Sequence, residues 1–319
     1  MGCWTRGWRM DVGSVDVGSP AAPATPDSRA DTGRPRPFAW VWRVLADPFT
    51  ATGAAIYLLF LLAGLCAGWL AQYDPTEILM TDDGQLAAGL APSAQHWLGT
   101  TSMGRDIFSQ LILGVRPSLF VGVTAALAVA SIGTAVGLLS GYFGGAVDQV
   151  LMRVSDIVLG LPFLPFVIVM ASLLGPSMKN VVLAVAILLW PNAARVVRAQ
   201  VLTLMQRGFI DAARVTGAGH ARIILVHVAP NVLPLSFLYG SIAVGWAILT
   251  QASIAFLGFG DSDVISWGYM LQDAYASQAL SSGQYFWFVP PGLCIVLVVL
   301  AGFFLSRGYE NLLFPKLES

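Results

Sequence analysis

The chain has 319 residues, of which 56% are hydrophobic and only 11% are charged. A soluble globular protein carries about 25% charged residues, and a compact fold of this size could not hide so much apolar surface from water. The composition therefore excludes an ordinary soluble enzyme and predicts an all-α, polytopic membrane protein. The formal net charge of −1 gives no general attraction to nucleic acid, so no nucleic-acid partner is expected.

The first part of the chain is predicted to lie outside the membrane. Residues 1–37 are rich in Gly, Pro, Ala, Ser and Asp. Such a segment cannot bury enough apolar area to offset the entropy of ordering it, so a disordered tail is expected. Residues 38–53 are apolar with Arg43 among them, which is typical of an interfacial segment that leads into a membrane.

Residues 54–319 are predicted to form a transmembrane domain, because this part contains six stretches close to the ~20 apolar residues that cross a bilayer. The predicted spans are residues 54–71, 118–141, 157–174, 181–198, 233–257 and 286–306. In the second span, Gly133, Gly137 and Gly141 repeat at intervals of four. That spacing lets two helices approach closely, so ordinary helix packing is the favoured interpretation.

The distribution of basic residues predicts the orientation. If the N-terminus is inside, only Arg105, Arg116 and Lys179 of the 17 Lys and Arg residues fall in outer segments. This asymmetry is the one that the positive-inside rule requires. Both termini are therefore expected in the cytoplasm, together with the loop 200–232.

Local pairing is the simplest role for several charged residues. Arg105 is expected to pair with its neighbour Asp106, with an outer binding surface formed by the two as the alternative. Arg153 is expected to pair with Asp156 three residues later on a helix. Arg195 and Arg198 are interpreted first as topology determinants.

Motifs for catalysis or energy conversion are missing from the sequence. A phosphate-binding loop needs Gly-Lys-Ser or Gly-Lys-Thr, but the only lysines, Lys179 and Lys316, follow Met178 and Pro315. The predicted spans contain no acidic or basic side chain apart from Arg195 and Arg198 at the end of the fourth, which argues against a proton-coupled mechanism. No catalytic residue, metal site or cofactor is predicted, and any ATP hydrolysis is expected on separate subunits.

The loop 200–232 carries the most informative pattern. Asp211 stands where an acid is favoured at the start of a helix, and two alanines, strong helix formers with little bulk, follow it. Gly217 fits a helix stop in the left-handed region, and Pro230 is expected to break the chain. The result is a short helix outside the membrane. The residues alone allow either a knob that inserts into a partner or an ordinary amphipathic connector, with Asp211 and Arg214 as a solvated pair.

Several motifs resemble one family of membrane proteins. The loop is similar to the E-A-A-x3-G signature of ABC importer permeases, with Asp211 in place of the Glu. Further matches are His96–Asp106, Gly141–Gly145, Phe256–Gly260 and Ser266–Leu271. Together they resemble the second permease subunit of the dipeptide, oligopeptide and nickel importer family.

The resemblance implies a type I ABC importer permease fold with six transmembrane helices in a bacterial or archaeal cell membrane. The implied partners are a second homologous permease, two cytoplasmic ABC ATPase subunits, an extracytoplasmic substrate-binding protein and membrane lipid. The implied ATPase-coupling residues are Asp211, Ala212, Ala213, Arg214, Gly217 and Pro230. The cargo implied is a di- or oligopeptide. An importer of nickel or another small solute, a secondary transporter or channel acting alone, and a membrane enzyme or scaffold are the alternatives.

Overall fold

The computed structural model describes residues 47–261 and 263–313, with side chains described through residue 308. The predicted tail, residues 1–37, and most of the interfacial segment, residues 38–53, lie outside the described residues. The described part of the chain is helical, and its only β pairings are isolated bridges. The predicted all-α class is therefore confirmed.

The helical elements, in chain order, are α2 (Pro48–Leu65), α3 (Ala67–Leu70), α4 (Ile107–Leu113), α5 (Val115–Phe143), α6 (Gly145–Leu159), α7 (Phe163–Leu174), α8 (Met178–Met205), α9 (Gly208–Val215), α10 (His220–Arg222), the π-helical turn η1 (Ile223–Val228), α11 (Ala229–Ile254), the π-helical turn η2 (Ala255–Phe259), α12 (Trp267–Ala276) and α13 (Tyr285–Leu313).

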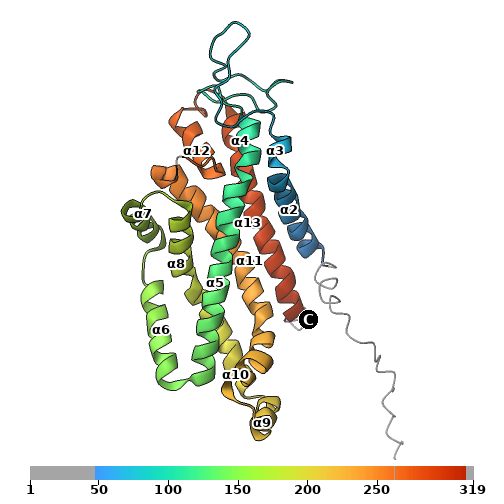
Figure 1. Ribbon diagram of the computed structural model, residues 1–319, viewed down its shortest axis with the longest axis vertical. Helices are drawn as coiled ribbons and strands as arrows, with labels where there is room; N and C mark the ends of the chain where they lie inside the picture. The colour runs from blue at the N-terminus through green and yellow to red at the C-terminus, as the bar shows by residue number, and fades with distance from the viewer. Residues whose placement is uncertain (1–46, 262, 314–319) are drawn as a thin grey trace, which may run out of the picture. The chain divides into compact units, whose positions relative to one another are not determined.

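Within the described part, five helical stretches are long and apolar enough to cross a membrane: α2, α4–α5, α8, α10–η2 and α13. A sixth crossing results if the bent pair α6–α7 counts as one span. Figure 1 shows α11 packed along α5 and α13, with α9 and α10 at one end of the bundle and α4 and α12 at the other. The structure thus has the crossings of a polytopic membrane protein.

The first membrane helix begins earlier than residue 54. The Asp47 carboxylate accepts a hydrogen bond from the Thr50 amide at 2.9 Å, and Pro48 occupies the first turn. An Asp cap followed by Pro is a strong helix start. The Asp carboxylate accepts from an amide that has no partner inside the helix, and Pro carries no amide proton that would need one.

The third predicted span, residues 157–174, is not one continuous helix. The chain is helical to Leu159, breaks at residues 160–162 and resumes at Phe163 at an angle of 86°. Gly160 ends α6, and Pro162 stands in the extended region (φ −68°, ψ 118°) before α7. A proline disfavours helical geometry in the residue before it, so Gly-Leu-Pro is the physical cause of the break.

The expected chain break at Pro230 is also wrong. The helical run continues from His220 through η1 and α11, and Pro230 lies in the first turn of α11. The amide of Ala229 reaches back to the carbonyl of Ile224, which is the wider spacing of a π turn. This local widening lets the chain pass a residue that lacks an amide proton.

The three glycines of α5 confirm the predicted close packing, and their partner is α8. A methyl group placed on Gly133 would lie 2.6 Å from the Ala193 Cβ, and one on Gly137 would lie 2.7 Å from the Ala194 carbonyl oxygen. One on Gly141 would lie 2.8 Å from the Val201 Cβ. The backbones of α5 and α8 can approach this closely only because these positions carry no side chain.

Candidate functional site

The short helix α9 projects from one end of the bundle (Figure 1). It follows α8 after a break at Gln206 and Arg207 and spans Gly208–Val215. Asp211 lies in its first turn and Arg214 in its last turn, which matches the charge preference of the helix dipole. The two side chains form an exposed ion pair of 3.2 Å, as the solvated-pair interpretation predicts.

The end of α9 is sharply defined. The amide of Gly217 donates to the Arg214 carbonyl at 2.9 Å, and the amide of Ala218 donates to the Ala213 carbonyl at 3.0 Å. Gly217 has φ +81°, so this is a Schellman-type stop that needs a left-handed residue. The expected helix stop at Gly217 is confirmed, and the stop turns the chain back toward the bundle.

One face of α9 is anchored in the bundle, and the other is free. Ile210 is 0% exposed and packs in a cluster with residues of α5, α8 and α11, and Ala213 is also buried. On the outside, Phe209 is 44% exposed, Val215 is 88% exposed, and Ala212 is exposed as well. The free face therefore combines apolar side chains with the exposed Asp211–Arg214 pair and is of low bulk at Ala212.

The segment that follows α9 is tied to the end of α5. The hydroxyl of Tyr142 lies 2.7 Å from Nδ1 of His220, and the two rings meet edge to face. The knob consisting of α9 and its turn, residues 208–219, is thus held by α8 on one side and by α5 and α11 on the other.

The residues singled out from the sequence do not all lie together. Asp211, Ala212, Ala213 and Arg214 share α9, and Gly217 ends it. Pro230 belongs instead to the first turn of α11. The apolar residues of α9 were not among the predicted site residues, although their alternation with Asp211 and Arg214 is visible in the sequence.

Two ion pairs join α6 to α8. Asp148 receives two hydrogen bonds of 2.5 Å from the Arg198 guanidinium and a third from the Ser140 hydroxyl. Asp156 pairs with Arg195 at 2.7 Å. The predicted pair of Arg153 with Asp156 is therefore wrong, because the packing of α6 against α8 brings a guanidinium from another helix to that carboxylate. Bidentate Arg–carboxylate pairs fix geometry as well as charge.

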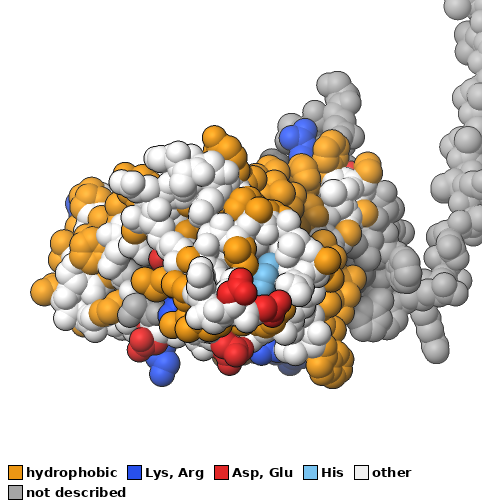
Figure 2. Space-filling view, turned by 90° about the horizontal axis from the view of Figure 1, so that it is seen from above, with side chains coloured by type: hydrophobic (Ala, Val, Ile, Leu, Met, Phe, Trp, Pro, Cys, Tyr) orange, Lys and Arg blue, Asp and Glu red, His pale blue; other side chains and the backbone are white. Residues whose placement is uncertain are grey.

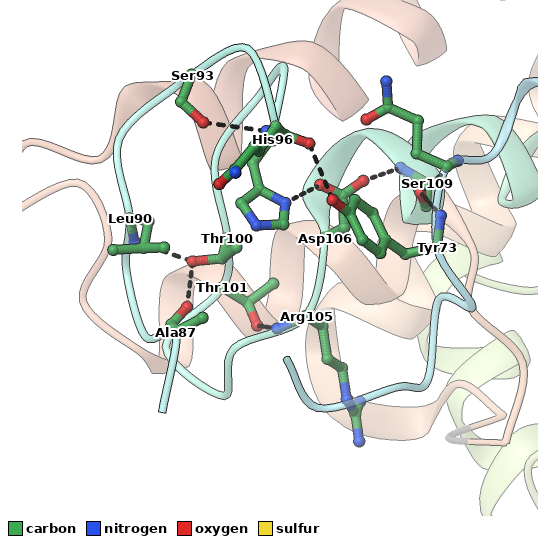
Figure 3. A network of polar contacts seen from close by, with 12 residues as sticks. Tyr73, Ala87, Leu90, Ser93, His96, Thr100, Thr101, Arg105, Asp106 and Ser109 are labelled. Carbon is green, nitrogen blue, oxygen red and sulfur yellow. Dashed lines mark hydrogen bonds and ion pairs between the residues drawn. The ribbon is translucent and has the colours of Figure 1, made fainter. Parts of the chain in front are cut away.

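The opposite end of the bundle is closed by an irregular cap, residues 71–106, whose polar contacts are drawn in Figure 3. Nδ1 of His96 lies 3.0 Å from the buried Asp106 carboxylate, which also accepts from the Ser109 amide at 2.8 Å and so starts α4. The Ser109 hydroxyl in turn accepts from the Tyr73 amide at 3.1 Å. The expected Arg105–Asp106 pair is wrong, because Asp106 turns inward to His96.

Acidic side chains gather on the surface of this end, as Figure 2 shows. Asp74, Glu77, Asp82 and Asp83 are exposed there. Hydrogen bonds from the Thr76 hydroxyl and amide hold the pKa of Asp74 below its ordinary value. On α12, burial raises the pKa of Asp273, and the positive charge of Arg105 opposes that rise only in part.

Comparison with known proteins gives a consistent result. A family described as binding-protein-dependent transport system inner membrane component matches residues 133–319. The chain is 35% identical over 277 residues to a probable D,D-dipeptide transport system permease protein, DdpC, of Escherichia coli K12, covering 86% of this chain and 90% of the relative. It is 36% identical over 285 residues to a glutathione transport system permease protein, GsiD, of Pectobacterium atrosepticum, covering 89% and 92%.

A third relative is a dipeptide transport system permease protein, DppC, of Alkalihalophilus pseudofirmus, which is 39% identical over 230 residues, or 72% of this chain and 74% of the relative. Among solved structures, one of inward-facing conformations of the MetNI methionine ABC transporter aligns with a TM-score of 0.49 at 19% identity. That alignment covers 63% of this chain and 95% of the other.

Proposed function

The chain belongs to the family of binding-protein-dependent transport system inner membrane components, and on that premise we propose that it is a peptide-importer permease driven through α9 by a separate ATPase. It is a multi-pass membrane protein and a permease subunit of an ABC importer. Beyond this role we propose the cargo, the partner subunits of the assembly and the residues of α9 through which the ATPase moves the permease.

The observation that carries the proposal is the construction of α9. The free face of α9 exposes Phe209 and Val215 beside the small Ala212, and exposed apolar side chains on a short helix are suited to a groove on another protein. Ile210 and Ala213 fasten the opposite face to the bundle, so a push on the free face is passed to α5, α8 and α11. An anchored knob transmits a displacement that a floppy connector would absorb.

The ATPase is inferred from a motif that this chain lacks, and the other partners from its relatives among importer permeases. The sequence contains no phosphate-binding loop, so ATP would be hydrolysed on two cytoplasmic ATPase subunits, one of which would hold α9. A second, homologous permease would complete the translocation path, and a binding protein would deliver the solute from outside. This arrangement requires both termini and α9 in the cytoplasm, as the distribution of basic residues indicates.

The relatives point to peptides as the cargo. Three of them carry the words dipeptide or glutathione in their names, and glutathione is itself a small peptide. We therefore infer that this chain passes di- or oligopeptides. Import of nickel or another small solute would need a polar or charged lining that recognises an ion.

The test is a charge placed on the free face of α9. Ala212→Glu puts an unpaired carboxylate into the proposed contact, and burying such a charge costs several kcal/mol. We expect co-purification of the ATPase to fall at least roughly tenfold, since each ~1.4 kcal/mol is a factor of ten. ATP-driven uptake of Ala-Ala by reconstituted vesicles should fall with it. The matched control is Ala146→Glu, an exposed alanine of α6.

Three results would contradict the proposal. One is normal ATPase binding and uptake by Ala212→Glu at normal expression. Another is uptake by the purified chain alone in response to a proton gradient, which would favour the secondary-transporter alternative. The third is protease or thiol-reagent access to residues 208–219 only from the extracytoplasmic side, which would refute the proposed orientation.

A further inference from the structure

An open cavity of about 760 Å³ lies between the α6–α7 break, α8 and α11. Its walls include Phe163, Leu188, Asn192, Tyr239 and Trp246. The volume falls in the range of about 300–1,000 Å³ that is typical of sites for small molecules. None of the described residues that line it carries a formal charge.

The break between α6 and α7 cannot face lipid. Residues 160–162 are non-helical and exposed, and Leu161 lines the cavity. Irregular backbone at membrane depth is tolerated only where it is buried in protein or lines a water-filled space, because hydrocarbon offers no hydrogen bonds. The same cavity is lined by Leu188 and Trp246, from the middle of two membrane-spanning helices, which places the break at membrane depth.

Two polar features of α8 on the side of this cavity also indicate that the face is not covered by lipid. The exposed amide of Asn192 has no hydrogen-bond partner among the described residues, and an unsatisfied amide in hydrocarbon costs several kcal/mol (~4–8 in the most apolar reference). One turn further along α8, Arg195 pairs with Asp156, and about half of each side chain is exposed. Half-exposed charges of this kind require water or another protein.

A second cavity, of about 700 Å³, serves as an internal comparison. It lies between α2, α5, α11 and α13 and has an almost wholly apolar lining that includes Ser131. Three of its hydroxyl groups are satisfied inside the bundle. Thr134 donates to Ser236 at 2.5 Å, and Ser241 donates to the Phe237 carbonyl at 2.9 Å. The Tyr57 hydroxyl is buried in the same lining and has no hydrogen-bond partner within the part of the chain that the structure describes. All described residues of this lining lie in helices, so no irregular backbone is exposed there, and lipid can cover this face.

We propose that the face formed by the α6–α7 break, α8 and α11 is this chain's wet wall of the translocation path. Asn192 offers an amide that hydrogen-bonds main-chain amides of a passing peptide. Trp246 and Phe163, whose rings are 6.3 Å apart, form an aromatic surface for its side chains. Because the lining is neutral, this wall favours peptides without selecting for side-chain charge. The proposal rests on the proposed function, which it extends to the contacting residues.

The test compares the two cavities by thiol accessibility in the assembled transporter. Asn192→Cys and, as the matched control, Ser131→Cys are made in a chain whose Cys3, Cys66 and Cys294 are replaced by Ala. Membrane vesicles are treated with a charged, membrane-impermeant methanethiosulfonate reagent. We expect Asn192→Cys to react on the order of a hundredfold faster, because only the thiolate reacts and a lipid-facing thiol stays protonated. Its modification should stop uptake of Ala-Ala.

A second variant tests the contact itself. Trp246→Ala should change the ratio of the uptake rates of Trp-Trp and Ala-Ala, whereas a purely structural defect would lower both rates equally. Equal reactivity of the two cysteines, or faster reaction of Ser131→Cys, would overturn the assignment of the wet wall. An unchanged rate ratio would overturn the role of Trp246. ATP dependence of uptake by the unmodified chain is measured in the same vesicles, so a failure of the proposed function would show there and leave the labelling contrast interpretable.

Discussion

The contact between α5 and α8 can be broken by one methyl group. In Gly137→Ala the added Cβ would lie 2.7 Å from both the Ala194 carbonyl oxygen and the Val197 Cβ. Real Cβ atoms do not approach other atoms within 3.0 Å, so the two backbones must separate. Overpacking of this kind costs about 1–3 kcal/mol. Replacing glycine by alanine inside a helix also gains about 1 kcal/mol of helix propensity, which a matched control must remove.

Gly240→Ala supplies that control. Gly240 lies inside α11, and its added methyl would meet only the Ala130 Cβ at an ordinary 3.6 Å. The propensity gain is common to both variants, so the difference between them isolates the cost of overpacking, about 1–3 kcal/mol. Unfolding of the purified chain by SDS in mixed micelles, followed by helical circular dichroism, measures that difference. If Gly137→Ala unfolds at the same SDS fraction as Gly240→Ala, the glycines do not set the distance between α5 and α8.

Three further outcomes are expected. Gly217→Ala should lower ATP-driven uptake, because a left-handed conformation costs a residue with a Cβ about 1–2 kcal/mol. The control Gly219→Ala should leave uptake unchanged, because Gly219 has an ordinary φ of −68°. Equal uptake by the two variants would contradict the role of the α9 stop. The raised pKa of Asp273 means that the folded chain binds its proton more tightly than the unfolded chain, so stability falls as pH rises above the ordinary value of 3.8. Asp273→Asn should therefore raise the melting temperature at pH 7, with a gain that disappears in acid; a gain independent of pH would refute this. Asp106→Ala removes both the α4 cap and the His96 contact and should cost about 1–3 kcal/mol, more than Asp106→Asn, which thermal unfolding would show.

Hydropathy and spacing were sufficient for the parts of this fold that depend on local chemistry. A run of apolar residues predicts a membrane span. A glycine after a short helical pattern predicts the helix stop at Gly217, and the repeat of Gly133 and Gly137 predicts close helix packing. Each of these features is decided by a few neighbouring residues. They could be predicted because the bilayer and the backbone impose the same rules on any chain.

The errors have a different origin. Asp156 has a basic neighbour at the i−3 position on its own helix, but the rotation of α6 against α8 decides that it meets Arg195 instead. Asp106 follows Arg105 directly, yet the irregular cap turns it inward to His96. Such pairs depend on tertiary placement. The chain continuity at Pro230 depends on a π turn, whose wider hydrogen-bond spacing leaves no distinct sequence pattern.

The placement of α8 joins the proposed knob to the proposed path. Its half nearest α9 is constrained on two faces, by ion pairs from Arg195 and Arg198 to α6 and by the tight glycine contacts with α5. A displacement of α9 is therefore not easily absorbed by bending in this half. Pro191 is the point in α8 where a backbone donor is missing and bending is easiest. Its neighbour Asn192 lines the 760 Å³ cavity. A displacement of α9 would therefore bend α8 at Pro191 and move the cavity wall that is proposed to contact the solute.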